Sequence, residues 1–467
     1  MGYYKFESQR TLVPQYDSMM IWESYADQLD VEYRQCEDEG LDIRAHKALF
    51  DAVRQMEPGI WKARLADVLF QMVINASMRS DYPYFEPSDI EGIRALRRPY
   101  QVAPDAEKEI PLSDRIHGAW MGRACGCLLG KTLEGMKSGE LQRLLKETDN
   151  WPLRRYVLWS DLTEEMFDQY TYPLREQCYA DLVQGMPEDD DTNYLVLAQE
   201  LVEQCGRDFT PWDVAGIWME KQKKGAYCTA ERIAYHNFVR GYRPPESAIY
   251  QNPYREYIGA QIRGDYFGYI NPGDPETAAD MAFRDASISH VKNGIYGEMF
   301  AAAMIACSAV TDDIEQIIRG GLAQIPETSR LYEAVMGVLE GYRQGVAEDE
   351  CFRYIHNRYD EHTDYGFTHT IPNAMVVVAA LLYGRGDFGR SICIAVENSY
   401  DTDCNGATVG SILGMRNGIA GIPLAWSKPI GDIIETSIIG VGRVSISQRA
   451  ARTLSHLKQT NRGGNML

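Results

Sequence analysis

The chain has 467 residues, 45% of them hydrophobic, and a formal net charge of −20. This charge argues against a nucleic-acid partner held through its phosphates, although metal ions can let an acidic protein bind an anionic small molecule. The length is sufficient for about two to three domains, or for one large hydrophobic core.

The cysteine pattern and the apolar segments bear on the compartment. The ten cysteines are scattered without a CxxC pair, which is typical of reduced thiols in a cytoplasmic protein. Residues 1–17 are polar and contain no apolar core, so we expect no signal peptide. Because no long apolar run occurs, we also expect no transmembrane helix and no membrane partner.

Residues 1–110 are predicted to form a separate helical region. Apolar residues recur at helical spacing in segments 45–50, 60–76 and 90–96. The stretch 100–111, with two prolines and several acids, is typical of a linker. We therefore predict an N-terminal accessory region over residues 1–110 and a larger helical domain over 111–467. Strand patterns are sparse throughout, which indicates a mainly α protein.

Glycines are spaced by four residues in two separate segments with a helical pattern. The first series is Gly118, Gly122, Gly126 and Gly130, and the second is Gly406, Gly410, Gly414 and Gly418. Residues four apart lie on one helix face, where each glycine costs about 1 kcal/mol relative to alanine. Close approach of another backbone would explain this cost, and the alternative is a fortuitous set of loop glycines.

Acidic residues are concentrated at two predicted helix starts. Asp189, Asp190 and Asp191 precede one helical pattern, and Asp401 and Asp403 precede the glycine-rich one. Helix N-termini favour negative charge, so N-capping or a solvated acidic turn is one interpretation. So many neighbouring carboxylates repel each other, however, and a divalent cation that prefers oxygen ligands would remove this repulsion. Both interpretations remain open on these residues alone.

Two further features are weaker. The segment 259–268 is rich in glycine and could approach a phosphate, but it matches no phosphate-loop spacing. His290 precedes another predicted helix, where a histidine is more often structural than functional. We take Gly259, Gln261 and His290 as the candidate substrate-binding residues.

Taken in order, these motifs resemble the ADP-ribosylglycohydrolase family over residues 114–427. The segment 126–130 (GCLLG) with Glu134 resembles the family's Gly-Asp-Ala-Leu-Gly motif and its following Glu. Segments 189–192 (DDDT) and 399–404 (SYDTDC) resemble Thr-Asp-Asp-Thr and Gly-Gly-Asp-Thr-Asp-Thr. The resemblance implies an all-α fold, a compact multi-helix orthogonal bundle with a central metal cleft. It also implies a cofactor of two Mg²⁺ ions, or Mn²⁺ in their place.

The resemblance also implies roles for individual residues. The implied metal ligands are Asp189, Asp190, Asp191, Asp401 and Asp403, and the implied catalytic residues are Glu134 and Asp190. The chain departs from the family pattern at Asp189, where the family has Thr, at Cys127, where it has Asp, and at Cys404, where it has Thr. A thiol is a poorer Mg²⁺ ligand than a hydroxyl, so one metal position is expected to be altered, with Asn405 as a substitute ligand.

The function that follows is metal-dependent hydrolysis of a ribosyl bond, glycosidic or ester, in an ADP-ribosylated protein or small metabolite. One alternative is a hydrolase of another N- or O-riboside, such as a nucleoside. A second is a non-enzymatic descendant of the fold in which the acids are structural. The Asp401-x-Asp403 pair is also found in aspartate-nucleophile phosphatases, but those enzymes place it after a buried strand and do not follow it with a glycine-rich helix.

Overall fold

The structure is a computed structural model that describes residues 16, 19–105 and 109–457. The expected lack of a signal peptide concerns residues 1–17, of which all but Tyr16 lie outside this part of the chain. The contacts divide the described residues into two units. The first runs up to Pro83 and includes Tyr250–Tyr254, and the second consists of the remaining residues. Residues 84–105 therefore belong to the second unit.

The first unit is a small helical assembly with its own core. It contains α1 (Leu29–Asp38), α2 (Lys47–Arg54) and α3 (Ile60–Ile74). On α3, Ala66, Leu69, Phe70 and Val73 are buried, at the spacing of three and four residues that defines one helix face. The ring of Phe70 packs edge-on against Tyr250, with a centroid separation of 5.3 Å. This aromatic contact joins the segment Tyr250–Tyr254 to the unit.

The second unit contains the remaining helices and the strands of the described residues. They are α4 (Ile90–Ala95), α5 (Leu112–Lys131), α6 (Ser138–Glu147), α7 (Glu164–Gln169), α8 (Asp190–Cys205), α9 (Pro211–Lys221), α10 (Thr229–Val239), α11 (Glu246–Ile249), α12 (Asp265–Tyr269), α13 (Pro275–Ala286), α14 (Lys292–Ser308), α15 (Ile314–Leu322), α16 (Arg330–Arg343), α17 (Glu348–Arg358), α18 (Asp364–Thr368), α19 (Thr370–Gly384), α20 (Phe388–Glu397), α21 (Thr402–Asn417), α22 (Leu424–Ser427), α23 (Ile446–Thr453), β1 (Ile433–Ile434) and β2 (Val444–Ser445). The strands pair antiparallel as one short ribbon. The predicted all-α fold class is confirmed.

The core of the second unit is formed by helices that are buried on nearly every side. On α14 all residues from Asn293 to Ser308 are buried, and α19 is almost as enclosed. A helix that is apolar all round must lie inside a protein or a membrane. No helix in the described ranges is long and apolar enough to cross a bilayer.

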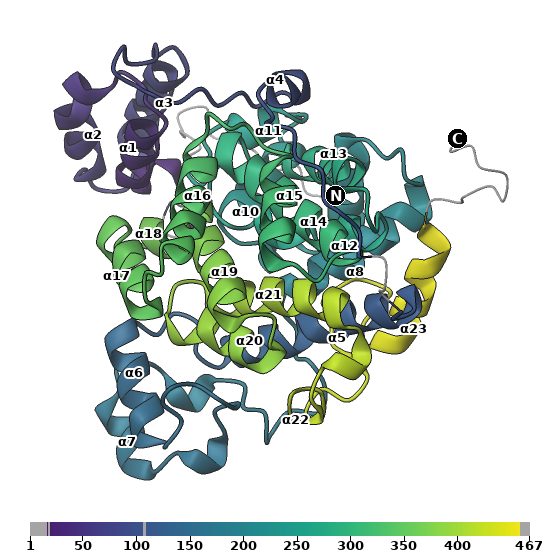
Figure 1. Cartoon of the computed structure of the whole chain (residues 1–467). Helices are drawn as coiled ribbons and strands as arrows, with labels where there is room; N and C mark the ends of the chain where they lie inside the picture. Colours follow the sequence, from purple (N-terminus) through teal and green to yellow (C-terminus); the bar gives the residue numbers. More distant parts are fainter. Residues whose placement is uncertain (1–15, 17–18, 106–108, 458–467) are drawn as a thin grey trace, which may run out of the picture. The chain divides into compact units, whose positions relative to one another are not determined.

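The two glycine series face each other between α5 and α21, which lie side by side in Figure 1. A Cβ atom added at Gly122 would overlap the carbonyl of Gly410, and one added at Gly126 would overlap the carbonyl of Gly406. Gly130 lies against the backbone of Asp403. The helices are therefore antiparallel, and the C-terminal end of α5 lies beside the acidic N-terminus of α21. The close backbone contact expected from the glycine spacing is confirmed.

Candidate metal-binding and catalytic site

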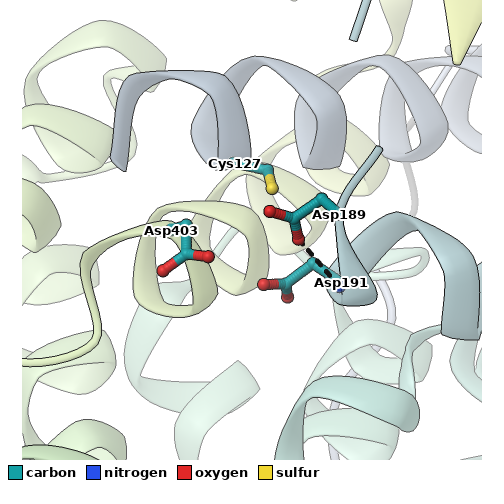
Figure 2. Close-up of side chains that lie close together, drawn as sticks. All are labelled: Cys127, Asp189, Asp191 and Asp403. Carbon is teal, nitrogen blue, oxygen red and sulfur yellow. Dashed lines mark hydrogen bonds between the residues drawn. The ribbon is translucent and has the colours of Figure 1, made fainter. Parts of the chain in front are cut away.

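The predicted acids of the two helix starts meet in one buried cluster. One ligand atom from each of Cys127, Asp189, Asp191 and Asp403 lies within 4.8 Å of the others. Asp189 and Asp191 project from the start of α8 toward Asp403 on α21, with Cys127 on α5 nearby (Figure 2). All four residues are at most 5% exposed. Asp401, Asp403 and Cys404 form a second, overlapping group.

The start of α8 holds its aspartates through capping. Asp189 is the N-cap residue, and its Oδ1 accepts a hydrogen bond from the backbone N–H of Asp191 at 2.9 Å. Asp190 and Asp191 occupy the first turn, where the helix dipole stabilises negative charge. Asp190 Oδ1 also accepts from the Asp191 N–H, at 3.1 Å. Bonds to this N–H therefore engage one oxygen each of Asp189 and Asp190 and leave the side chain of Asp191 for other partners.

The loop before α21 is held in an unfavourable backbone conformation. Ser399 and Tyr400 have φ of 65° and 61°, in the left-handed region that costs non-glycine residues about 1–2 kcal/mol. Two hydrogen bonds support them: Ser399 Oγ donates to the Met136 carbonyl and Tyr400 Oη to the Tyr359 carbonyl, each at 2.8 Å. These contacts fix the turn that delivers Asp401.

Neighbouring elements also fix the first turn of α21. Thr402 Oγ1 donates to the carbonyl of Gly130 at 2.9 Å, joining the start of α21 to the end of α5. Asn373 Oδ1 accepts from the backbone N–H of Asp401 at 3.2 Å and from Asn405 Nδ2 at 2.8 Å. Asn405, the predicted substitute ligand, thus donates its amide N–H to Asn373, while its buried Oδ1 accepts no hydrogen bond from the described residues.

A fully buried arginine, Arg123, holds Asp191 in place through hydrogen bonds. The Arg123 guanidinium donates to Asp191 Oδ1 at 2.8 Å, to the Asp191 carbonyl at 2.9 Å and to Asp265 Oδ2 at 2.6 Å. Sequence reasoning missed this residue. Its signal was the spacing of four between Arg123, Cys127 and Lys131, which places all three on one face of α5.

Lys131 was also missed, and it lies at the edge of the cluster. Its ammonium donates to Asp189 Oδ2 at 2.8 Å, while its side chain is 21% exposed. Burial would lower the pKa of Lys131, but the adjacent Asp189 and the other acids raise it above its ordinary value. The lysine is therefore a fixed positive charge in the site.

Negative charge exceeds positive charge in this part of the molecule. The carboxylates are Asp189, Asp190, Asp191, Asp265, Asp401, Asp403 and Glu134, and the cations are Arg123 and Lys131. Burial, with the charge of Asp189, raises the pKa of Asp403 to about 6. Burial likewise raises the pKa of Asp191 well above its usual range, although Arg123 opposes the effect. The cluster thus requires protons or another cation for neutrality.

The oxygen atoms left without partners fit a divalent cation. Asp191 Oδ2 and Asp403 Oδ1 are buried and accept no hydrogen bond within the part of the chain that the structure describes. A buried, unpaired carboxylate oxygen is costly, and hard divalent cations such as Mg²⁺ prefer oxygen ligands of this kind. The donor set therefore fits such an ion.

The thiols modify this donor set. Burial raises the pKa of both the Cys127 and the Cys404 thiols well above the usual value. Each is therefore a neutral thiol in the metal-free protein, and a thiol is a weak ligand for a hard cation. Cys127 places a neutral sulfur where a further carboxylate would strengthen the site.

The two predicted catalytic acids are more accessible than the rest of the cluster. Glu134 is exposed and lies in the turn after the end of α5, four residues beyond Gly130, which contacts Asp403, whereas Asp190 is half-buried. The negative charge of Asp403 is the largest cause that raises the pKa of Glu134, and burial is the largest for Asp190. Solvent thus reaches Glu134 and part of Asp190 beside the buried acidic cluster.

The candidate substrate-binding residues lie around a different buried cation, Arg263. Its guanidinium donates to the carbonyl of Gly259 at 3.2 Å and to Glu231 Oε1 at 2.9 Å. Gln261 Oε1 accepts from Thr370 Oγ1 at 2.9 Å, and Gln261 is 2% exposed.

His290 belongs to the same buried surroundings. It is 1% exposed, and its Nδ1 bonds to Ser289 Oγ at 2.8 Å. Burial lowers the pKa of His290 well below its ordinary value, and the charge of Arg263 adds to this effect. The contacts above join Gly259, Gln261 and His290 to other residues of this protein. Their roles in substrate binding stay predictions.

The fold and the cluster define an all-α protein with a buried, acid-rich centre suited to hydrolysis. A family model described as ADP-ribosylglycohydrolase matches residues 108–462, most of the chain. The chain belongs to the ADP-ribosylglycohydrolase family, which makes it a member of a hydrolase family that acts on ADP-ribosyl-type substrates.

Comparison with solved structures and with curated proteins adds little to this assignment. A solved structure titled "ADP-ribosylglycohydrolase-related protein complex" is similar at 18% sequence identity and a TM-score of 0.44. The match covers 74% of this chain and 97% of the other. A search of curated proteins found no significant match.

Proposed function

We propose that the protein is a divalent-cation-dependent hydrolase that cleaves the bond between an ADP-ribosyl group and a protein side chain or a small metabolite. Mg²⁺ is the proposed cofactor, with Mn²⁺ as a substitute. The observation that carries the proposal is the pair of unpartnered carboxylate oxygens on Asp191 and Asp403 inside the acidic cluster. Family membership supplies the substrate class.

Each acid has a proposed role that follows from its position. Asp191 and Asp403 hold the cation, because one buried oxygen of each accepts no hydrogen bond from the residues that the structure describes. Asp401, which shares a group of ligand atoms with Asp403, and the half-buried Asp190 complete the acidic surroundings. Arg123 keeps Asp191 in place through its hydrogen bonds to both the side chain and the backbone.

The proposed reaction breaks the bond from ribose C1 to the leaving atom and forms a bond from C1 to a water oxygen. Glycosidic cleavage of this kind passes through an oxocarbenium-like state and depends on proton transfer by carboxyl groups. Glu134 takes the proton from the attacking water, because it is the accessible acid beside the cluster, and this proton passes to the leaving atom as its bond to C1 breaks. A positioned group of this type contributes about 10²–10⁴-fold. The bound cation would orient ribose hydroxyls and lower the pKa of the water.

The test is hydrolysis of a panel of ribosyl compounds. N-linked, O-linked and ester-linked ADP-ribosyl compounds and the nucleoside inosine would be incubated with the protein in Mg²⁺ and in EDTA. Chromatography would measure released ADP-ribose or ribose. We expect ADP-ribose from at least one ADP-ribosyl compound, only with Mg²⁺, and no release by Asp403→Asn.

A matched control is Asp168→Asn, which makes the same chemical change on exposed α7. It should retain the full rate. Release of ribose from inosine alone would replace the ADP-ribosyl assignment with a nucleoside one, and inactivity toward the whole panel would count against the proposed reaction.

A further inference from the structure

The lysine at the edge of the acidic cluster, Lys131, bears on how many cations the site can bind. Asp189 has both of its carboxylate oxygens engaged: Oδ1 accepts from the Asp191 N–H at 2.9 Å and Oδ2 from the Lys131 ammonium at 2.8 Å. The side chain of Asp189 is 3% exposed, and each of its oxygens already accepts one hydrogen bond. An ion bound to Asp189 would lie next to the Lys131 ammonium and would compete with it for the same carboxylate.

The remaining unpaired oxygens are on the other two acids of the cluster. Asp191 Oδ2 and Asp403 Oδ1 are buried and accept no hydrogen bond from the described residues, and both residues belong to the group in which one ligand atom of each lies within 4.8 Å of the others. They come from different helices and point to a shared ligand. The cluster of Cys127, Asp189, Asp191 and Asp403 thus has one position filled by a positive side chain and one position that lacks a cation. The second group, Asp401, Asp403 and Cys404, shares Asp403 with this cluster and therefore borders the same position.

We propose that the Lys131 ammonium is a built-in cation of this site, and that the chain therefore binds one divalent cation, held by Asp191 and Asp403. The inference rests on the proposed function, and it departs from the two ions that the sequence resemblance implied. Asp189 then acts as the counter-ion of Lys131 and not as a metal ligand.

The physical reason is repulsion between like charges in a poorly solvated place. Positive charges a few ångströms apart repel much more strongly at the effective dielectric of a protein site than in water. A second divalent ion beside Lys131 would meet this repulsion and would find Asp189 already neutralised.

The experiment counts Mn²⁺ on the metal-free full-length protein and records whether bound ions are magnetically coupled. Native mass spectrometry gives the number bound, and electron paramagnetic resonance distinguishes an isolated Mn²⁺ from an adjacent pair. We expect the wild type to bind one isolated Mn²⁺. Lys131→Met, which removes the charge but keeps an unbranched chain, should bind a coupled pair or bind its first Mn²⁺ at least about tenfold more tightly.

Controls separate the charge from the side chain's bulk. Lys131→Arg keeps the charge and should bind one isolated ion like the wild type. Lys146→Met removes an exposed lysine from α6 and should also bind one, which excludes an effect of net charge alone.

The outcomes also distinguish this inference from the proposed function. A coupled pair on the wild type would overturn the inference and leave the proposed function standing, even if the variants failed to fold. Wild-type stoichiometry and affinity in Lys131→Met would overturn it too. Absence of any Mn²⁺ binding to the wild type would contradict both the inference and the cation dependence on which it rests.

Discussion

Gly122 on α5 and Gly410 on α21 face each other so closely that a Cβ atom on either residue would overlap the carbonyl oxygen of the other. This contact is the middle of the antiparallel packing that ends where Gly130 lies against Asp403. The position of the acidic helix start therefore depends on glycines that are remote from it in sequence. Function and packing are connected through the backbones of these two helices.

Substitution of these glycines should destabilise the protein. Gly122→Ala and Gly410→Ala each insert a methyl group into a backbone contact, and overpacking of this kind typically costs about 1–3 kcal/mol. Urea denaturation followed by circular dichroism would measure the free energy of unfolding. Gly216→Ala in α9 is the control, because nothing lies within 4 Å of its added Cβ. It should be neutral or stabilising by up to about 1 kcal/mol. Parent-like stability of Gly410→Ala would refute the close contact.

The helix contact and the acidic helix starts were predictable because both depend on local spacing. Glycines four apart mark one helix face wherever the partner lies, and aspartates before an apolar periodic segment mark a helix N-terminus. By contrast, the pairing of Arg123 with Asp265 and of Lys131 with Asp189 joins segments far apart in the chain. The spacing of Arg123, Cys127 and Lys131 shows that they share one helix face. No local pattern shows which acidic residues contact that face.

The extent of the second unit could not be predicted from local spacing either, because contacts between distant segments define it. The stretch 100–111 resembles a linker, which predicts that residues 84–105 belong to the N-terminal region. In the structure the Glu86 carboxylate accepts hydrogen bonds from the Arg330 guanidinium at 2.9 Å and from Asn293 Nδ2 at 2.8 Å. These buried contacts span more than 200 positions. Such a long-range ion pair leaves no periodic trace in the sequence.

In the strained turn before α21, glycine should be more stable than alanine at position 399, which is the reverse of the order inside a helix. Ser399→Ala and Ser399→Gly both lose the hydrogen bond to Met136, but only glycine relieves the left-handed backbone. The glycine variant should be more stable than the alanine variant by about 1 kcal/mol. At Ser411, inside α21, the order should be the opposite, because glycine weakens a helix interior. Differential scanning calorimetry of the four variants measures both orders, and an alanine variant at 399 at least as stable as the glycine one would refute the strain.

Divalent cations should stabilise the folded protein. The buried acids repel each other in the metal-free state, and an ion that binds only the folded chain shifts the unfolding equilibrium. At an ion concentration of 100 times Kd the gain is about 2.7 kcal/mol. Thermal unfolding in millimolar Mg²⁺, in Mn²⁺ and in EDTA measures the effect. The same Tm in all three solutions would argue against a cation site.

The thiol at position 127 should limit Mg²⁺ binding. Cys127→Asp replaces a neutral buried sulfur by a carboxylate, so the metal-free variant should melt below the wild type and show a larger rise in Tm with Mg²⁺. Cys127→Ser changes the size little and adds no charge, and its Mg²⁺-dependent rise should stay close to that of the wild type. If Cys127→Asp gains no more from Mg²⁺ than Cys127→Ser does, Cys127 does not face the bound ion.

The most direct test of the central claim compares Asp403→Asn with Glu134→Gln in the Mg²⁺-dependent rise of Tm and in turnover. Asp403 is proposed to hold the ion and Glu134 to move a proton. The account predicts that Asp403→Asn loses both properties, because a neutral amide cannot offset the charge of the cation. Glu134→Gln should lose turnover by about 10²–10⁴-fold and keep most of the rise in Tm. Loss of that rise in Glu134→Gln, or its persistence in Asp403→Asn, would contradict the proposed division of roles.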